Sequence, residues 1–269
     1  MPEGHTLYRL AREQTQLFAG RPVRVSSPQG RFEAGASLLD GRVLDEVSSH
    51  GKHLFAAFGG DTLHVHLGLY GSYTTGTGTP PPARGALRMR WEGSGPNGDG
   101  VWTDLRGPTA CEVLSAPEVE RILGRLGPDP LRRRADGNPA HRRISGSRTP
   151  IGALLMDQAV LAGVGNVYRA ELLFRHGVSP FRPGQGVDPH LWSRMWADLV
   201  VLMRSGVRMG RIVTTRPEDR SRRRGAVQRD DAHYVYCRTG LPCRMCGTEV
   251  RTELMVGRNL YWCPVCQAV

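Results

Sequence analysis

The chain has 269 residues, a formal net charge of +11 and a pI of about 10.0. Its length suits one large or two medium domains, and its 39% of hydrophobic residues is normal for a soluble globular protein. No apolar run approaches the length needed to cross a bilayer, and no basic-then-apolar signal peptide opens the chain. We therefore expect a cytoplasmic protein with no membrane partner.

The positive charge is carried almost entirely by arginine, because Lys52 is the only lysine in the chain. A strongly basic soluble protein favours a polyanionic partner, although positive charge can also serve solubility alone. Arginine is planar, bulkier than an ammonium group and cannot be deprotonated. A single lysine therefore indicates a position where arginine does not serve, unless it survives by chance.

The first part of the chain predicts a β-sandwich led by one helix. Residues 6–18 place apolar side chains on one helical face, with Thr6 as a candidate N-cap and Gly20 as a candidate end. Residues 63–67 alternate apolar and polar side chains, which is typical of a strand, and Gly- and Pro-rich stretches between such segments predict loops. We assign residues 1–115 to this N-terminal domain.

The rest of the chain is helical in pattern until a cysteine-rich end. Residues 116–149 form a connector that begins with a short helix capped by Ser115. Residues 150–232 form a helical domain, and residues 233–269 carry short strand signals around four cysteines. The helices expected in the middle domain cover residues 151–160, 167–176, 188–205 and, as a short one, 208–212.

Two cysteine pairs predict a metal site. Cys243 and Cys246 form one C-x-x-C pair, Cys263 and Cys266 form another, and sixteen residues separate the pairs. This spacing is typical of a tetrahedral thiolate zinc site, and disulfides are disfavoured in the cytosol. Four protein ligands leave no open position, so one Zn²⁺ is expected in a structural rather than a catalytic role.

Two further positions offer contacts to a polyanion. A glycine-rich turn at 163–165 precedes a helix that Asn166 can cap, and the N–H groups at a helix start bind phosphate well. Arg258 lies between the cysteine pairs, where a hairpin held by metal can present a guanidinium to a phosphate or a base edge. Each feature alone also has an ordinary explanation, as a helical hairpin or a solvated surface arginine.

The N-terminus can supply a nucleophile. Pro2 follows the initiator methionine, and a small second residue normally permits removal of that methionine, which leaves a secondary amine. Such an amine attacks an electrophilic carbon to give an iminium ion, which labilises the neighbouring C–H bond. Glu3 beside it can act as general acid or base. Met-Pro-Glu is also an ordinary start, so this interpretation depends on the rest of the chain.

Five segments together resemble the formamidopyrimidine-DNA glycosylase/endonuclease VIII family. In chain order they are MPEGHT at the start, GKHL at 51–54, LGPDPL at 126–131, QAVLAGVGNVYRAE at 158–171 and GRNLYWCPVCQ near the C-terminus. The resemblance spans nearly the whole chain and is similar in detail to actinobacterial endonuclease VIII-like proteins. It implies an α+β fold: an N-terminal β-sandwich with a leading helix, a helix–two-turn–helix domain and a C-terminal zinc ribbon.

The resemblance implies a base excision repair enzyme that removes a damaged base and cleaves the abasic site. Pro2 matches the nucleophile that attacks C1′ of the damaged nucleotide, and Glu3 matches a proton donor and relay. Lys52 matches a contact to the phosphate beside the lesion, while Asn166 and Arg258 match residues that grip neighbouring phosphates. β- and then δ-elimination from the iminium would cut both sides of the sugar. The expected partner is damaged DNA, bound by a monomer associated with the bacterial nucleoid.

The lesion class is indicated by the residues that would fill the gap left by a flipped base. Leu69 and Tyr70 match the Leu–Tyr pair of the endonuclease VIII branch, and the Arg–Phe pair of the formamidopyrimidine branch is missing from residues 104–110. This favours oxidised pyrimidines. Two positions depart from the family: Thr6 stands where relatives often carry a second carboxylate, and Gly68 where one branch has glutamine.

Three other interpretations compete with this one. The same chemistry could act on oxidised purines such as 8-oxoguanine. The chain could be a catalytically silent DNA-binding protein, which the retention of Pro2, Glu3 and Lys52 argues against. A ribosomal or RNA-binding zinc-ribbon protein is disfavoured by the long β-rich N-terminal half.

Overall fold

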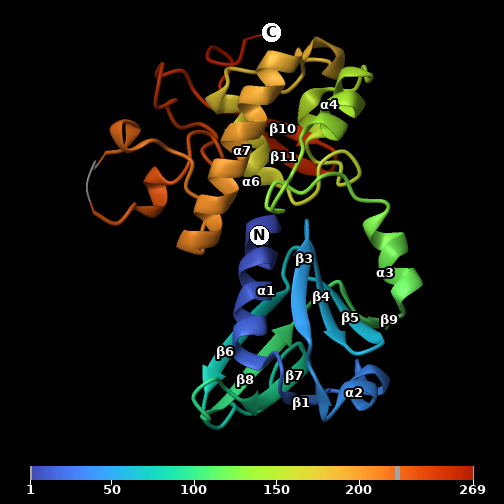
Figure 1. Ribbon diagram of the computed structural model, residues 1–269. Coiled ribbons are helices and arrows are strands. Elements are labelled where there is room, and N and C mark those ends of the chain that lie inside the picture. The colour runs from blue at the N-terminus through green and yellow to red at the C-terminus, as the bar shows by residue number, and fades with distance from the viewer. Residues whose placement is uncertain (1, 222–224, 269) are drawn as a thin grey trace. The chain divides into compact units, whose positions relative to one another are not determined.

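The computed structural model describes residues 2–221 and 225–268. Contacts divide the chain into two compact units, Met1–Arg125 and Leu126–Val269 (Figure 1). Each unit has its own hydrophobic core. Among the described residues, no helix combines the length and the apolar stretch that a membrane span requires.

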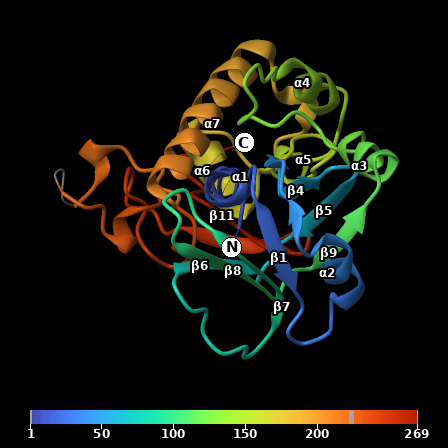
Figure 2. The same ribbon diagram turned by 60° about the horizontal axis from the view of Figure 1, so that its bottom comes forward.

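The first unit is an antiparallel β-sandwich with a leading helix. Its elements are α1 (Gly4–Phe18), β1 (Pro22–Ser26), α2 (Glu33–Leu39), β2 (Arg42–Val43), β3 (Glu46–His50), β4 (His53–Phe58), β5 (Asp61–His66), β6 (Ser72–Thr77), β7 (Leu87–Ser94), β8 (Gly100–Arg106), β9 (Ala110–Leu114) and α3 (Ala116–Leu123). One sheet has the order β2-β1-β7-β8-β6 and the other the order β3-β4-β5-β9, and Figure 2 shows β6, β8, β7 and β1 side by side. The predicted fold class is confirmed.

Aromatic packing joins α1 to both sheets. Trp91 on β7 is fully buried, and the rings of Phe18 and Phe58 meet it edge-on at centroid distances of 5.7 and 5.8 Å. Each such pair contributes roughly 0.5–1.5 kcal/mol beyond the burial of its area. Helix α1, which directly follows Pro2 and Glu3, is therefore anchored firmly in the core.

Helix α1 begins two residues earlier than the sequence predicts. Glu3 is its N-cap, in an extended conformation with φ −123° and ψ 179°, and the Glu3 carbonyl accepts the N–H of Thr6 at 2.8 Å. The prediction of Thr6 as the cap is wrong: Thr6 lies in the first turn, with its hydroxyl 3.3 Å from Nε2 of His5. The helix ends before Gly20, whose φ of +75° suits the expected terminator.

The second unit combines helices with a short hairpin. Its elements are α4 (Asn138–Ser145), α5 (Ile151–Leu154), α6 (Asn166–Arg175), η1 (Gly184–Gly186), α7 (Pro189–Met209), η2 (Pro217–Asp219), η3 (Arg229–Asp231), β10 (Arg251–Met255) and β11 (Arg258–Trp262). Helix α4 lies inside the segment expected as a connector. The C-terminal hairpin packs on α6, where the rings of Phe174 and Tyr234 stack at 4.9 Å.

The helix predicted over 151–160 stops after its first turn. The amide side chain of Gln158 donates to the carbonyls of Met156 and Val164 at 2.9 and 3.0 Å and accepts the N–H of Gly163 at 3.0 Å. These bonds stabilise a turn in place of a second helical turn. This side-chain competition explains why apolar periodicity alone overestimates α5.

The last long helix runs further than predicted. Helix α7 is capped at its start by Asp188, whose carboxylate accepts the N–H groups of His190 and Leu191, and it continues to Met209. Gly210 then adopts φ +67° and ends it. The separate short helix predicted at 208–212 is therefore not formed.

Candidate active site and nucleic-acid interface

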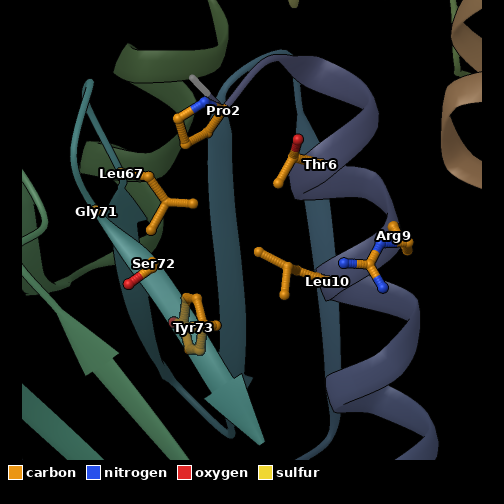
Figure 3. A pocket seen from close by; sticks show the side chains of 8 residues that line it. All are labelled: Pro2, Thr6, Arg9, Leu10, Leu67, Gly71, Ser72 and Tyr73. Atoms are coloured by element: carbon orange, nitrogen blue, oxygen red, sulfur yellow. The ribbon is translucent and has the colours of Figure 1, made fainter. Parts of the chain in front are cut away.

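An open pocket lies beside Pro2 in the first unit. Its cavity volume is about 260 Å³. Figure 3 shows the side chains that line it, which are Pro2, Thr6, Arg9 and Leu10 from the N-terminus and α1, and Leu67, Gly71, Ser72 and Tyr73 from the end of β5 to β6. Two well-anchored elements therefore place the proline at a pocket that a substrate can enter.

Glu3 is buried directly beside Pro2, with 0% of its surface exposed. Its backbone is fixed as the N-cap of α1. A buried glutamate that directly follows a candidate nucleophile in the chain is a candidate for acid–base chemistry.

The pocket presents positive charge and hydroxyl groups. Among the described residues that line it, none has a carboxyl group. The ion pair of Arg9 with Glu13 spans 3.7 Å between exposed side chains and is weak. Burial, together with the charge of Arg9, lowers the pKa of His5 to about 4, so this imidazole is neutral at pH 7. Arg9 is thus the cation that a substrate meets at the pocket.

Lys52 lies in the two-residue turn that joins β3 to β4. His50 and His53 form the last pair of the ladder, and Gly51 and Lys52 make the turn between them. Gly51 has φ +59°. That conformation favours glycine, as the turn type requires. The hairpin therefore presents the single lysine at its tip.

Leu69 and Tyr70 lie in the turn between β5 and β6. Tyr70 is 89% exposed and Leu69 is 37% exposed, so this turn presents two adjacent large side chains at the surface. Gly68 has φ +66°, and a Cβ at this position would lie 1.9 Å from Oγ1 of Thr109. The turn therefore requires glycine at 68, which explains the departure from the branch with glutamine.

In the second unit, Asn166 is the first residue of α6, and the N-cap is Gly165. The prediction of Asn166 as the cap is wrong, because its side chain bonds elsewhere. Its Nδ2 donates to the carbonyl of Asn259 at 2.8 Å, and its Oδ1 accepts from Arg169. Asn166 is 5% exposed and joins the start of α6 to strand β11.

Two charged residues that the sequence reasoning missed hold the second unit together. Arg169 is fully buried and also donates to the carbonyls of Met255 and Asn259, on the two strands of the hairpin. The carboxylate of Glu171, also buried, accepts the hydroxyl of Thr214 and the backbone N–H groups of residues 234, 235 and 236 at 2.7, 2.8 and 2.8 Å. In the sequence, these two residues are recognisable only as an arginine and a glutamate within a mostly apolar helical segment.

We expect Glu171→Leu to destabilise the second unit by roughly 3–5 kcal/mol, because it leaves buried N–H groups without an acceptor. Urea unfolding with the full chain measures this change. Glu171→Gln keeps one acceptor oxygen and should cost less, and Glu218→Leu, at an exposed glutamate, is the control. A Glu171→Leu protein as stable as the control would contradict the account of this carboxylate.

Arg258 opens β11 directly after the hairpin turn. It pairs with Met255 across the two-residue turn of Val256 and Gly257, which have φ +52° and +67°. The Arg258 side chain is exposed. The hairpin therefore presents a guanidinium beside its tip, as the spacing predicts.

The four cysteines form one structural zinc site. Their Sγ atoms all lie within 4.8 Å of one another, with 3.8 Å between Cys243 and Cys266 and 3.4 Å between Cys246 and Cys263. Four thiolates at the usual Zn–S length of about 2.3 Å lie about 3.8 Å apart, so the cluster fits a tetrahedral ion. The predicted zinc is confirmed by this geometry and by the family match given below.

Three family descriptions match successive parts of the chain. The formamidopyrimidine-DNA glycosylase N-terminal domain matches residues 1–111, the helix–two-turn–helix domain of the same enzyme matches 126–218, and the zinc finger shared with isoleucyl-tRNA synthetase matches 240–269.

Two similar relatives match nearly the whole chain. A protein named endonuclease 8 1, from Mycobacterium bovis, is 54% identical over 99% of this chain and 100% of its own length. A DNA-(apurinic or apyrimidinic site) lyase of Mycolicibacterium smegmatis is 34% identical over 99% of both chains. The formamidopyrimidine-DNA glycosylase of Lactococcus lactis, solved with DNA that contains an abasic site, shares the fold with a TM-score of 0.81 at 21% identity, over 99% of this chain and 100% of that one. The chain therefore belongs to the formamidopyrimidine-DNA glycosylase/endonuclease VIII family of DNA glycosylases and abasic-site lyases.

Proposed function

We propose that this chain excises oxidised pyrimidines from DNA and cleaves the resulting abasic site, with the amine of Pro2 as the nucleophile. The observation that carries this proposal is the position of Pro2 at an open pocket, followed in the chain by the fully buried Glu3. The amine is free only after Met1 is removed, and Met1 lies outside the described residues.

The chemistry follows from a secondary amine. The nitrogen of Pro2 attacks C1′, the glycosidic bond breaks, and the base leaves with the bonding electrons and a proton. Opening of the sugar ring places a proton on O4′ and gives the C1′ iminium, for which the proline N–H is lost. Loss of a C2′ proton then expels the 3′ phosphate, loss of a C4′ proton expels the 5′ phosphate, and water releases the remaining fragment from Pro2.

Glu3 and Lys52 support these steps. Glu3, the buried neighbour of Pro2 in the chain, would give a proton to the leaving groups and accept the proton that the amine loses. Lys52, at the tip of a hairpin, supplies a compact ammonium for the phosphate beside the lesion. The two groups serve different atoms of the same nucleotide.

We propose that DNA is held from both units by a monomer that acts in the nucleoid. The exposed Arg258 contacts a phosphate, and the first turn of α6, which begins at Asn166, offers backbone N–H groups to another. Leu69 and Tyr70 fill the gap in the duplex after the nucleotide flips, which explains their exposure.

The substrate class is tested by single-turnover excision from duplexes that carry thymine glycol, 5-hydroxyuracil or 8-oxoguanine. The exposed Leu69–Tyr70 pair supports pyrimidines, while the description of the matching domains as formamidopyrimidine-DNA glycosylase supports oxidised purines as the alternative. We expect the two pyrimidine lesions to be excised faster. Faster excision of 8-oxoguanine would replace the proposal with its alternative.

We expect Lys52→Arg to slow cleavage of abasic-site DNA about tenfold although the charge is kept. The planar guanidinium is larger and cannot reproduce the contact of an ammonium group at the tip of a two-residue turn. Single-turnover cleavage measures the change, with Arg258→Lys as the converse exchange. Unchanged kinetics for Lys52→Arg would mean that the lone lysine is incidental.

A further inference from the structure

A hydrogen-bonded row of polar side chains, centred on the buried His64, crosses one face of the β3-β4-β5-β9 sheet. His64 on β5 pairs directly with Glu112 on β9, and His53 on β4 lies diagonally across from His64, next to its direct partner Phe55 along the same face. His64 Nε2 lies 2.9 Å from His53 Nδ1, and His64 Nδ1 lies 2.9 Å from Oε1 of Glu112. The ring of Phe55 packs against His64 at a centroid distance of 5.3 Å, and His64 is only 4% exposed.

The carboxylate of Glu112, at one end of this hydrogen-bonded row, determines which ring nitrogens donate and which accept. An ionised Glu112 only accepts, so His64 Nδ1 donates, and in the neutral form of the His64 ring Nε2 then accepts. His53 Nδ1 is then the donor to His64, which leaves His53 Nε2 as an acceptor. One carboxylate therefore selects one tautomer and one orientation for both rings.

His53, at one end of this hydrogen-bonded row, is next to Lys52 in the sequence. His53 directly follows Lys52 and closes the ladder below its turn. Burial, together with the charges of His66, His64, His50 and Lys52, lowers the pKa of His53 to about 3. This ring is therefore neutral at pH 7, and the charge of Lys52 is one of the causes. His66, whose ring centroid lies 4.9 Å from that of His53, has its pKa lowered by burial and by the charges of His64 and Lys52.

We propose that Glu112, His64 and His53 form a hydrogen-bonded relay that holds the Lys52 turn in place for the cleavage of DNA. Burying a polar ring such as His64 costs free energy that an apolar side chain would avoid, and its two hydrogen bonds offset that cost while fixing one arrangement. The three residues are positioning residues, since they act through Lys52. This inference rests on the proposed role of Lys52.

The test is a double-mutant cycle that measures single-turnover cleavage of an abasic-site duplex by the full chain. Glu112→Leu and His64→Leu are made alone and together with Lys52→Met, and binding of an uncleavable tetrahydrofuran duplex is measured in parallel. We expect each substitution to slow cleavage about fivefold while binding changes less than twofold. In the Lys52→Met background neither should slow cleavage further.

Two controls separate the relay from general packing. Glu112→Gln keeps an acceptor for His64 Nδ1 and should cleave at nearly the wild-type rate, as should Glu46→Leu at an exposed glutamate of β3 in the same sheet. Glu112 is about half exposed, so its substitution should leave the fold intact even if His64→Leu does not fold.

Each contrary result identifies what fails. Wild-type rates in Glu112→Leu and His64→Leu, or equal slowing in the Lys52→Met background, would overturn the relay and leave the proposed function standing. A Lys52→Met protein that cleaves as fast as the wild type would overturn both the relay and the proposed role of Lys52.

Discussion

Glu3→Gln is expected to lower the rate of base excision by roughly 10²–10⁴-fold, which is the usual contribution of a positioned acid–base group. The amide has the shape of the carboxyl group, so α1 and the pocket beside Pro2 should keep their structure. It can neither give a proton to the departing base nor accept one from the proline nitrogen. Single-turnover excision from a lesion-containing duplex measures the loss.

The control for this experiment is Glu33→Gln, an exposed glutamate at the start of α2 in the same unit. Its excision rate should equal that of the wild type. Binding of an uncleavable duplex should be nearly unchanged in Glu3→Gln, because the substitution removes a proton donor and not a DNA contact. Excision at the wild-type rate by Glu3→Gln would remove Glu3 from the mechanism.

Cys246→Ser is expected to abolish zinc binding and to weaken DNA binding by at least about tenfold. A serine hydroxyl is a poor replacement for a thiolate, and the free energy of zinc binding in such sites, about 10–16 kcal/mol, is also folding free energy. Loss of the metal should therefore release the hairpin of β10 and β11, and with it Arg258. Zinc content by mass spectrometry and DNA binding by fluorescence anisotropy measure the two effects.

Cys237→Ser is the matched control, because Cys237 is exposed and lies outside the four-cysteine cluster. It should keep one zinc per chain and wild-type DNA affinity. If Cys246→Ser lost its zinc and still bound DNA as the wild type does, the hairpin would have no part in holding DNA.

Features set by short sequence distances were predictable. The zinc site depends on two local cysteine pairs, and α1 on a regular apolar period. The turn that carries Leu69 and Tyr70 follows directly from a strand pattern that ends in glycine. In each case the residues that determine the structure lie within a few positions of one another, or in a spacing that itself identifies the metal.

Features that depend on distant partners were not predictable. The side chain of Glu171 accepts backbone groups more than sixty residues away, and Asn166 bonds to Asn259. The relay joins His53 to Glu112 through three strands whose register the sequence does not reveal. Helix α5 ends early because Gln158 competes for backbone groups, which apolar periodicity does not record.

The role of Pro2 as nucleophile is tested most directly by borohydride trapping on an abasic-site duplex, with the adduct mapped by peptide mass spectrometry. Borohydride reduces an iminium to a stable amine, so a covalent protein–DNA species captures the intermediate itself. We expect one adduct on the nitrogen of Pro2, in protein whose Met1 has been removed. No adduct, with Met1 removed and DNA binding intact, would contradict the account and indicate a protein that binds DNA without cleaving it.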